Sequence, residues 1–108
     1  MNAATPATIP DAAELLAALA VTRDALAIPH AATVGDDEIR AKILDERLGH
    51  TVAMLDALFE RLTDGRDADI PWSVAYLRAR LAEHPAEGYK TWGERVAELA
   101  AAEAAAGR

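Results

Sequence analysis

The chain has 108 residues, no cysteine and a formal net charge of −7. This length predicts one domain with a modest hydrophobic core. The lack of cysteine excludes disulfides and thiolate zinc sites, and the acidic balance disfavours direct nucleic-acid binding, because phosphate contacts need clustered cations. No apolar run is long enough for a membrane span, and residues 1–9 lack the basic and apolar regions of a signal peptide. We therefore expect a cytoplasmic protein.

Charge and aromatic residues are distributed unevenly along the chain. Residues 1–69 hold thirteen Asp and Glu against six Lys and Arg, whereas residues 70–108 hold five of each. Four of the five aromatic residues also lie in the second part, within a short stretch. About a quarter of the chain is alanine, which favours helices but adds little buried area. We expect marginal stability, which dimerisation would supplement.

Residues 1–10 are small and polar with two prolines, and we expect a disordered lead-in there. A single helical domain should fill residues 11–108. Its first helix should begin at Asp11, which has the spacing of an N-cap to Glu14, and should end near Ala27, since Pro29 disfavours helical geometry at the residue before it. Its apolar stripe consists of leucines at helical spacing: Leu15, Leu16, Leu19 and Leu26.

The second helix should be the longest, from about Asp37 to Leu62, with acidic residues at its start that complement the helix dipole. Two apolar stripes lie roughly a quarter-turn apart on this helix. The first contains Leu44, Leu48, Val52, Leu55, Phe59 and Leu62, and the second contains Ile39, Ile43, Met54 and Leu58. An apolar arc of this width predicts a central helix that touches more than one neighbour.

A turn over residues 63–69 should lead into a third helix from Pro71 to Glu83, because proline is favoured at the first helical position. Its core stripe should be Val74, Leu77 and Leu81. Thr91 and Glu94 form a capping box that predicts a fourth helix, whose alanine-rich end should fray from about residue 101. With no strand-like alternation, the sequence predicts an all-α class, a small bundle of about four helices.

The aromatic and basic residues of the last two helices are the candidate partner-binding residues: Trp72, Tyr76, Arg80, Tyr89, Lys90 and Trp92. Trp72, Tyr76 and Arg80 form one row at intervals of one turn, and Arg80 can stack on Tyr76 as a cation–π pair. One interpretation is an anchor surface for a partner protein. The alternative is that the rings pack the third helix against the fourth. We expect them mainly at that seam, with Arg80 and Lys90 on its rim available to a partner.

No pattern predicts a metal, a cofactor or a catalytic residue. Glu46 and His50 have a spacing that suits two ligands on one metal, but the adjacent pair Glu83 and His84 cannot face them in the way that a helical carboxylate site requires. The acidic turn at residues 64–69 lacks the spacing and the terminal glutamate of a calcium loop. The single serine, Ser73, has no identifiable histidine partner.

These observations favour a non-enzymatic helical module that binds other proteins or regulates them, most simply as a homodimer that shares an apolar stripe of the second helix. An alternative of another class is an acidic decoy that occupies a nucleic-acid-binding site on another protein, because the first 69 residues carry the whole net charge. A helix-turn-helix over residues 71–99 is disfavoured, since the second of its helices carries several glutamates and the connector is long.

Overall fold

The structure is a computed structural model, and it describes residues 10–64 and 68–107. Four helices follow one another along the chain: α1 (Ala12–Leu26), α2 (Val34–Thr63), α3 (Ile70–Glu83) and α4 (Trp92–Ala106). The described residues form no strand, only an isolated bridge between Ala31 and Thr91. The predicted all-α class and the long second helix are therefore confirmed, while the expected disordered lead-in lies outside the described residues except for Pro10.

Each helix begins at a side chain that accepts a hydrogen bond from a backbone N–H group of the first turn, as the sequence predicts for Asp11 and Thr91. The four N-caps are Asp11, Thr33, Asp69 and Thr91. The capping box of Thr91 with Glu94 is confirmed. Thr33 was not expected as a cap, and because its hydroxyl accepts from the Asp36 N–H at 3.1 Å, α2 begins earlier than predicted.

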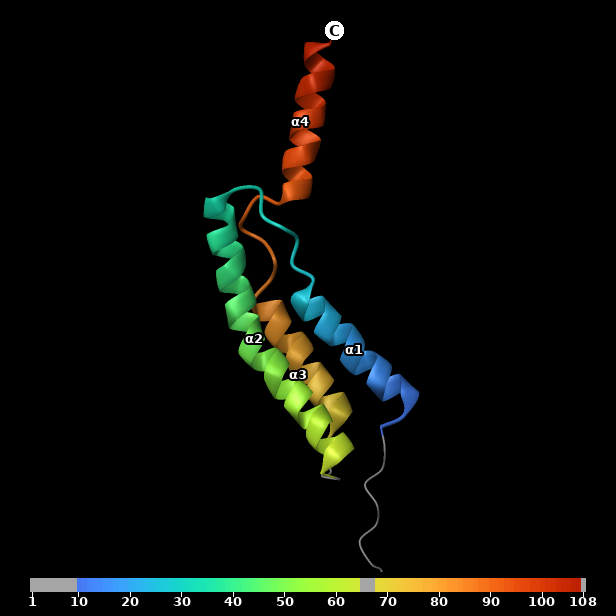
Figure 1. Cartoon of the computed structure of the whole chain (residues 1–108). Helices are drawn as coiled ribbons and strands as arrows, with labels where there is room; N and C mark the ends of the chain where they lie inside the picture. The colour runs from blue at the N-terminus through green and yellow to red at the C-terminus, as the bar shows by residue number, and fades with distance from the viewer. Residues whose placement is uncertain (1–9, 65–67, 108) are drawn as a thin grey trace, which may run out of the picture.

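Helices α1, α2 and α3 form the bundle, in which every pair of helices is in contact. In Figure 1, α2 and α3 lie side by side and run in opposite directions, with α1 beside them. The buried core is assembled from all three helices: Ala18, Val21, Met54, Ile70, Val74 and Leu77. The predicted core positions Val74 and Leu77 of α3 are buried here, and Leu81 packs against them from the edge.

The orientation of α1 differs from the one that its leucines suggest. Its buried residues are Ala18, Val21 and Ala25, whereas Leu16, Leu19 and Leu26 are 67%, 65% and 54% exposed. Small side chains on the inner face let α1 approach both α2 and α3 closely. Three of the four leucines of the expected apolar stripe therefore face outward, and Leu15 is half-buried, while Val21, which lies off that stripe, is buried.

A second, smaller cluster closes the end of the bundle where α2 begins. It consists of Ile28, Ile43 and Tyr89, which come from the α1–α2 connector, α2 and the α3–α4 connector. The two connectors pair through backbone hydrogen bonds, from the Ala32 N–H to the Lys90 carbonyl at 2.9 Å and from the Trp92 N–H to the His30 carbonyl at 2.7 Å. The base of α4 is fixed to the bundle in this way.

Helix α4 projects from that end of the bundle and, over its described length, contacts none of the other three helices (Figure 1). The molecule is therefore elongated, measuring 81 × 24 × 19 Å. The helix continues to Ala106, beyond residue 101 where we expected fraying, as its many alanines allow. None of the helices in the described part of the chain combines the length and the apolar character that a bilayer span requires.

Candidate interaction surfaces

The first three predicted partner residues form the expected row on α3. The Trp72 and Tyr76 rings are stacked, with 5.6 Å between their centroids and 12° between their planes. The Arg80 guanidinium lies 5.7 Å from the Tyr76 ring centroid and pairs with Glu83 at 2.8 Å. Trp72 is 64% exposed. The row is therefore ordered by its own stacking, and its outer end is open to a partner.

The row continues into a polar cluster between α2 and α3 that the sequence analysis did not assemble. The Tyr76 hydroxyl and His50 Nδ1 are 2.7 Å apart, His50 stacks on His84 at 6.3 Å, and His84 Nδ1 lies 2.8 Å from a Glu46 oxygen. The sequence feature that pointed to this cluster was the spacing of Glu46 and His50, which lie one turn apart on the same helix. No group of three or more His, Asp or Glu side chains within the described residues is arranged to hold a metal ion.

The other three predicted residues lie apart from this row. Tyr89 is buried in the cluster at the end of the bundle, where its hydroxyl donates to the Pro29 carbonyl at 2.7 Å, and burial raises its pKa. Lys90 pairs with Glu98 at 2.8 Å, and Trp92 is 54% exposed at the start of α4. Because α3 and α4 share no contact along their described lengths, the expected seam between these helices does not form.

Arg47 is a buried charge that the sequence analysis missed. Its side chain reaches the carboxyl ends of two helices, donating to the His84 carbonyl at 2.9 Å and to the Ala25 carbonyl at 3.2 Å. Burial lowers its pKa. Carbonyl groups at helix ends lack partners within their helix and carry partial negative charge, so a guanidinium suits them. The role of Arg47 is structural. The sequence could have indicated its burial, because Arg47 lies on the same face of α2 as the apolar residues Ile43 and Met54.

The most extensive apolar surface lies on α2. Five large side chains follow one another at alternating intervals of four and three residues, and each is between 38% and 66% exposed: Leu48, Val52, Leu55, Phe59 and Leu62. This spacing forms a continuous stripe along one side of a helix. The two predicted stripes of α2 therefore differ in burial. Ile43 and Met54 are buried, whereas the other stripe, apart from the half-buried Leu44, is exposed and has no neighbour within the described structure.

The contacts of α2 show on which side this stripe lies. His50 and Arg61 contact α3, through Tyr76 and the Ala68 carbonyl that precedes the helix. Around the axis of α2, the buried residues Thr51 and Met54 lie in the middle. His50 and Arg61 lie to one side of them, toward α3, and the exposed stripe lies to the other side, toward α1. Its polar border away from the core includes the exposed residues Asp45 and Asp56.

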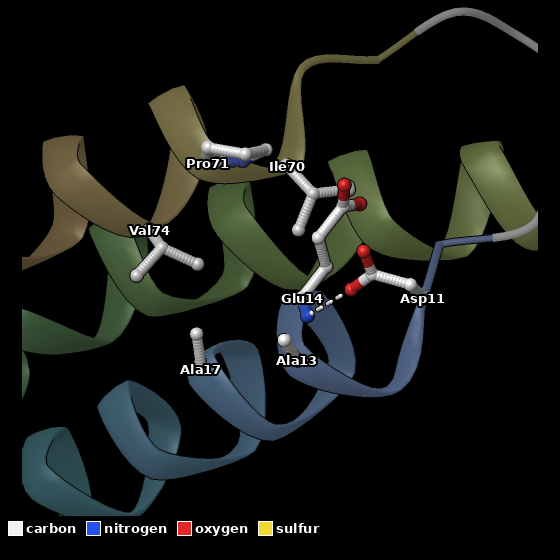
Figure 2. Close-up of a pocket in the computed structure, with 7 residues that line it drawn as sticks. All are labelled: Asp11, Ala13, Glu14, Ala17, Ile70, Pro71 and Val74. Carbon is white, nitrogen blue, oxygen red and sulfur yellow. Dashed lines mark hydrogen bonds between the residues drawn. The ribbon is translucent and has the colours of Figure 1, made fainter.

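The exposed leucines Leu19 and Leu26 of α1 lie on the side of this helix that points away from α3. Ala13 and Ala17 line a groove with Ile70 and Val74 of α3, so that side of α1 faces α3 (Figure 2). Around the axis of α1, Leu19 and Leu26 lie on the other side of the buried Ala18 from Ala17, and therefore toward α2. We call the combined surface the α1/α2 face: Leu19, Leu26, Leu48, Val52, Leu55, Phe59 and Leu62.

The groove in Figure 2 lies between the first turns of α1 and α3 and has a volume of about 350 Å³. Its walls are mostly apolar, and two carboxylates border it. The Asp11 carboxylate accepts from the Glu14 N–H at 2.8 Å, while Glu14 Oε2 is shielded from solvent and has no hydrogen-bond partner among the described residues. The lining of the groove includes no serine, histidine, lysine or arginine.

Many acidic side chains of the first 69 residues have structural roles. Asp11, Asp36 and Asp69 accept hydrogen bonds at or beside helix starts. Asp24 pairs with Arg78 at 3.6 Å, and Glu46 pairs with His84. Hydrogen bonds from Thr33 and from the Lys90 N–H lower the pKa of Asp36, which joins the start of α2 to the connector before α4. The acidic composition therefore partly reflects capping and pairing.

The single serine is also engaged in structure. Ser73 is buried, and its hydroxyl donates to the Asp69 carbonyl at 3.0 Å in the first turn of α3. The surfaces with the strongest physical signal are thus the α1/α2 face and the Trp72–Tyr76–Arg80 row. No family model, no curated protein and no solved structure matches this chain.

Proposed function

We propose that this protein is a non-enzymatic interaction module that acts as a homodimer, with the α1/α2 face at the contact between the two copies. The observation that carries the proposal is the placement of the apolar side chains. Fourteen large apolar side chains of the described residues are exposed, and seven of them gather on this one face. Contiguous apolar patches of this kind mark interaction sites.

The energetics favour burial of the face. Each leucine, valine or phenylalanine that moves from water into an apolar contact contributes about 1.5–3 kcal/mol. The core of one copy is small and includes two alanines, Ala18 and Ala25, on the α1 side. A second copy presents the same face, and one self-complementary contact closes a twofold dimer.

The Trp72–Tyr76–Arg80 row supports the interaction part of the proposal. It lies on the side of α3 that faces α2 and His50, whereas the α1/α2 face lies on the other side of α2, so both surfaces are available at once. Exposed tryptophan beside arginine is typical of residues that anchor a partner protein. We infer that the dimer presents two such rows to a protein partner.

The dimer contact is tested by light scattering on two matched variants of α2. Leu55→Glu places a charge in the centre of the α1/α2 face, and we expect it to convert the dimer into a folded monomer, because an uncompensated charge in an apolar contact is strongly unfavourable. Ala53→Glu adds the same charge on the exposed polar side of α2 and should leave the dimer intact. A monomeric wild-type chain at micromolar concentration would overturn the proposal.

The acidic-decoy alternative has weaker support. The carboxylates that remain for it on the outer side of α2 include Glu38, Asp45 and Asp56, and their separations of seven and eleven residues correspond to about 10 and 16 Å along the helix. These intervals are wider than the phosphate spacing of double-stranded DNA, about 3.4 Å per strand along the helix axis. A solvated face accounts for these residues without a further role.

A further inference from the structure

Gly49 lies inside the longest helix, and nothing among the described residues of one copy requires a glycine there. Helix α2 continues without interruption from Val34 to Thr63, and the backbone at Gly49 does not have the positive φ that favours glycine. A Cβ added at this position would meet no other side chain and no neighbouring helix within 4 Å. Because glycine is less favourable than alanine inside a helix, we looked for its role outside the single copy.

The position of Gly49 places it at the edge of the exposed stripe of α2. It follows Leu48, the first large side chain of the stripe, and lies about 100° further around the helix, on the side away from the core. Asp45 and Asp56 lie on the same edge, and Gly49 itself is exposed. The missing side chain leaves open space beside Leu48 and Val52. A large side chain from another molecule can therefore approach the backbone of α2 closely at this point.

The largest side chain of the α1/α2 face stands at a matching distance from this open space. Phe59 is 66% exposed, and it lies ten residues after Gly49, about 15 Å along the helix. The midpoint between these two residues is residue 54, and the midpoint of the stripe from Leu48 to Leu62 is residue 55. A twofold axis through this midpoint, perpendicular to α2, brings each phenylalanine ring over the glycine of the other copy. The same axis keeps nearly the whole length of both stripes in contact.

The two edges of the α1/α2 face differ in polarity, and this difference favours one direction of the paired helices. One edge carries Leu19 and Leu26 of α1, and the other carries Asp45 and Asp56 of α2. If the two α2 helices ran parallel, the leucine edge of each copy would meet the acidic edge of the other. In an antiparallel pair, like edges meet. The leucines of both copies then face one another, and the carboxylates stay at a solvent-exposed edge, where their repulsion is screened.

We propose that the two α2 helices of the dimer pack antiparallel, with Phe59 of each copy lying over Gly49 of the other. This inference rests on the proposed homodimer and specifies how the second copy is seated on the α1/α2 face. In a packed pair of helices, each large apolar side chain inserts between side chains of the facing helix. Phe59 inserts beside Leu48 and Val52, where the glycine leaves room for the ring. The contact is made twice in a twofold dimer and closes at two copies.

The contact is tested first with the full chain and matched substitutions in α2. Gly49→Leu should raise the dissociation constant of the dimer by about a hundredfold, because the added side chain fills the space of the ring in both halves of the contact. Ala53→Leu adds a leucine one turn further on, away from the stripe, and should leave the constant unchanged. Sedimentation measures the constant, and circular dichroism checks that both variants keep their helix content. An unchanged constant for Gly49→Leu would overturn the contact.

A double substitution tests whether Phe59 is the side chain that occupies this space. Phe59→Ala should itself weaken the dimer. In the Phe59→Ala background, however, Gly49→Leu should raise the dissociation constant by a much smaller factor than in the wild type, because the leucine then enters the room that the ring has left. Equal factors in the two backgrounds would overturn the pairing of Phe59 with Gly49.

Because the chain has no cysteine, single cysteines report the direction of the helices. A mixture of the Gly49→Cys and Phe59→Cys variants should form a disulfide between the two chains under mild oxidation. Phe59→Cys alone should form little, because the antiparallel register separates the two copies of position 59 by about 15 Å along the helices. Efficient crosslinking of Phe59→Cys to itself, as parallel helices would give, would overturn the antiparallel contact and leave the proposed homodimer in place. A monomeric wild-type chain would overturn both.

Discussion

At the level of single residues, two polar groups connect parts of the chain that are distant in sequence. Arg47 joins the carboxyl ends of α1 and α3, through the carbonyls of Ala25 and His84. Asp36 joins the start of α2 to the connector that leads into α4, through the Lys90 N–H. Each group acts through its hydrogen bonds as well as through its charge. Substitutions that remove the charge, or that keep the charge and change the hydrogen bonds, therefore separate these two contributions to stability.

Replacing Arg47 with methionine should lower the free energy of unfolding by about 3 kcal/mol, because buried carbonyls at two helix ends lose their donor. Arg47→Lys should recover only part of this loss, since an ammonium group lacks the planar fork that reaches both carbonyls. Arg23→Met is the control, because the Arg23 side chain is 75% exposed. Urea denaturation measures all three variants at one protein concentration. Equal losses for Arg47→Met and Arg23→Met would contradict the role of Arg47.

Asp36 should make the attachment of α4 sensitive to acid. Its pKa in the folded protein is lowered from the ordinary value of 3.8, chiefly by the Thr33 hydroxyl and the Lys90 N–H. The stabilisation is therefore complete above pH 4 or so and is lost as the pH falls toward the lowered pKa. Asp36→Asn should lose less stability than the wild type between pH 5 and pH 2.5 or so, measured by urea denaturation. The same acid dependence in the wild type and in Asp36→Asn would contradict the assignment.

At the level of elements, the four helices follow from local signals in the sequence, but the orientation of α1 does not. Caps, prolines and apolar periodicity predict where helices begin and end, because these effects act within a few residues. The choice between two apolar sides of α1 depends instead on how closely α2 and α3 approach. Alanine at 18 and 25 permits the close packing, and the periodicity of the leucines carries no information about this distance.

The orientation of α1 predicts an unusual pair of substitutions. Ala18→Leu should lower the free energy of unfolding by about 1–3 kcal/mol, because Ala18 is 1% exposed and a larger side chain would overpack the core. Leu19→Ala, one residue further on and 65% exposed, should leave the fold of one copy almost unchanged while weakening the dimer. Urea denaturation at protein concentrations below the dissociation constant of the dimer separates the two effects. A larger loss for Leu19→Ala than for Ala18→Leu under these conditions would show that the leucines face inward.

At the level of the whole molecule, the placement of the candidate residues was predictable in part. The Trp72–Tyr76–Arg80 row was predicted correctly, since it depends only on spacing within one helix. The grouping of this row with Tyr89, Lys90 and Trp92 was not, because the direction in which α4 leaves the bundle is set by the pairing of two connectors. The α1/α2 face combines stripes from two helices, and it becomes visible only once the packing shows which stripe each helix leaves outside.

The central claim is that these outward-facing apolar side chains belong to a contact between two copies of the chain. Sedimentation equilibrium of the unmodified protein tests it most directly, over a concentration range that spans the micromolar region. The account predicts a mass that rises from that of one 11.5 kDa chain to twice that value and then remains constant, because the contact closes at two copies. The mass of a single chain at every concentration would contradict the account, and so would a mass that continued to rise beyond two chains.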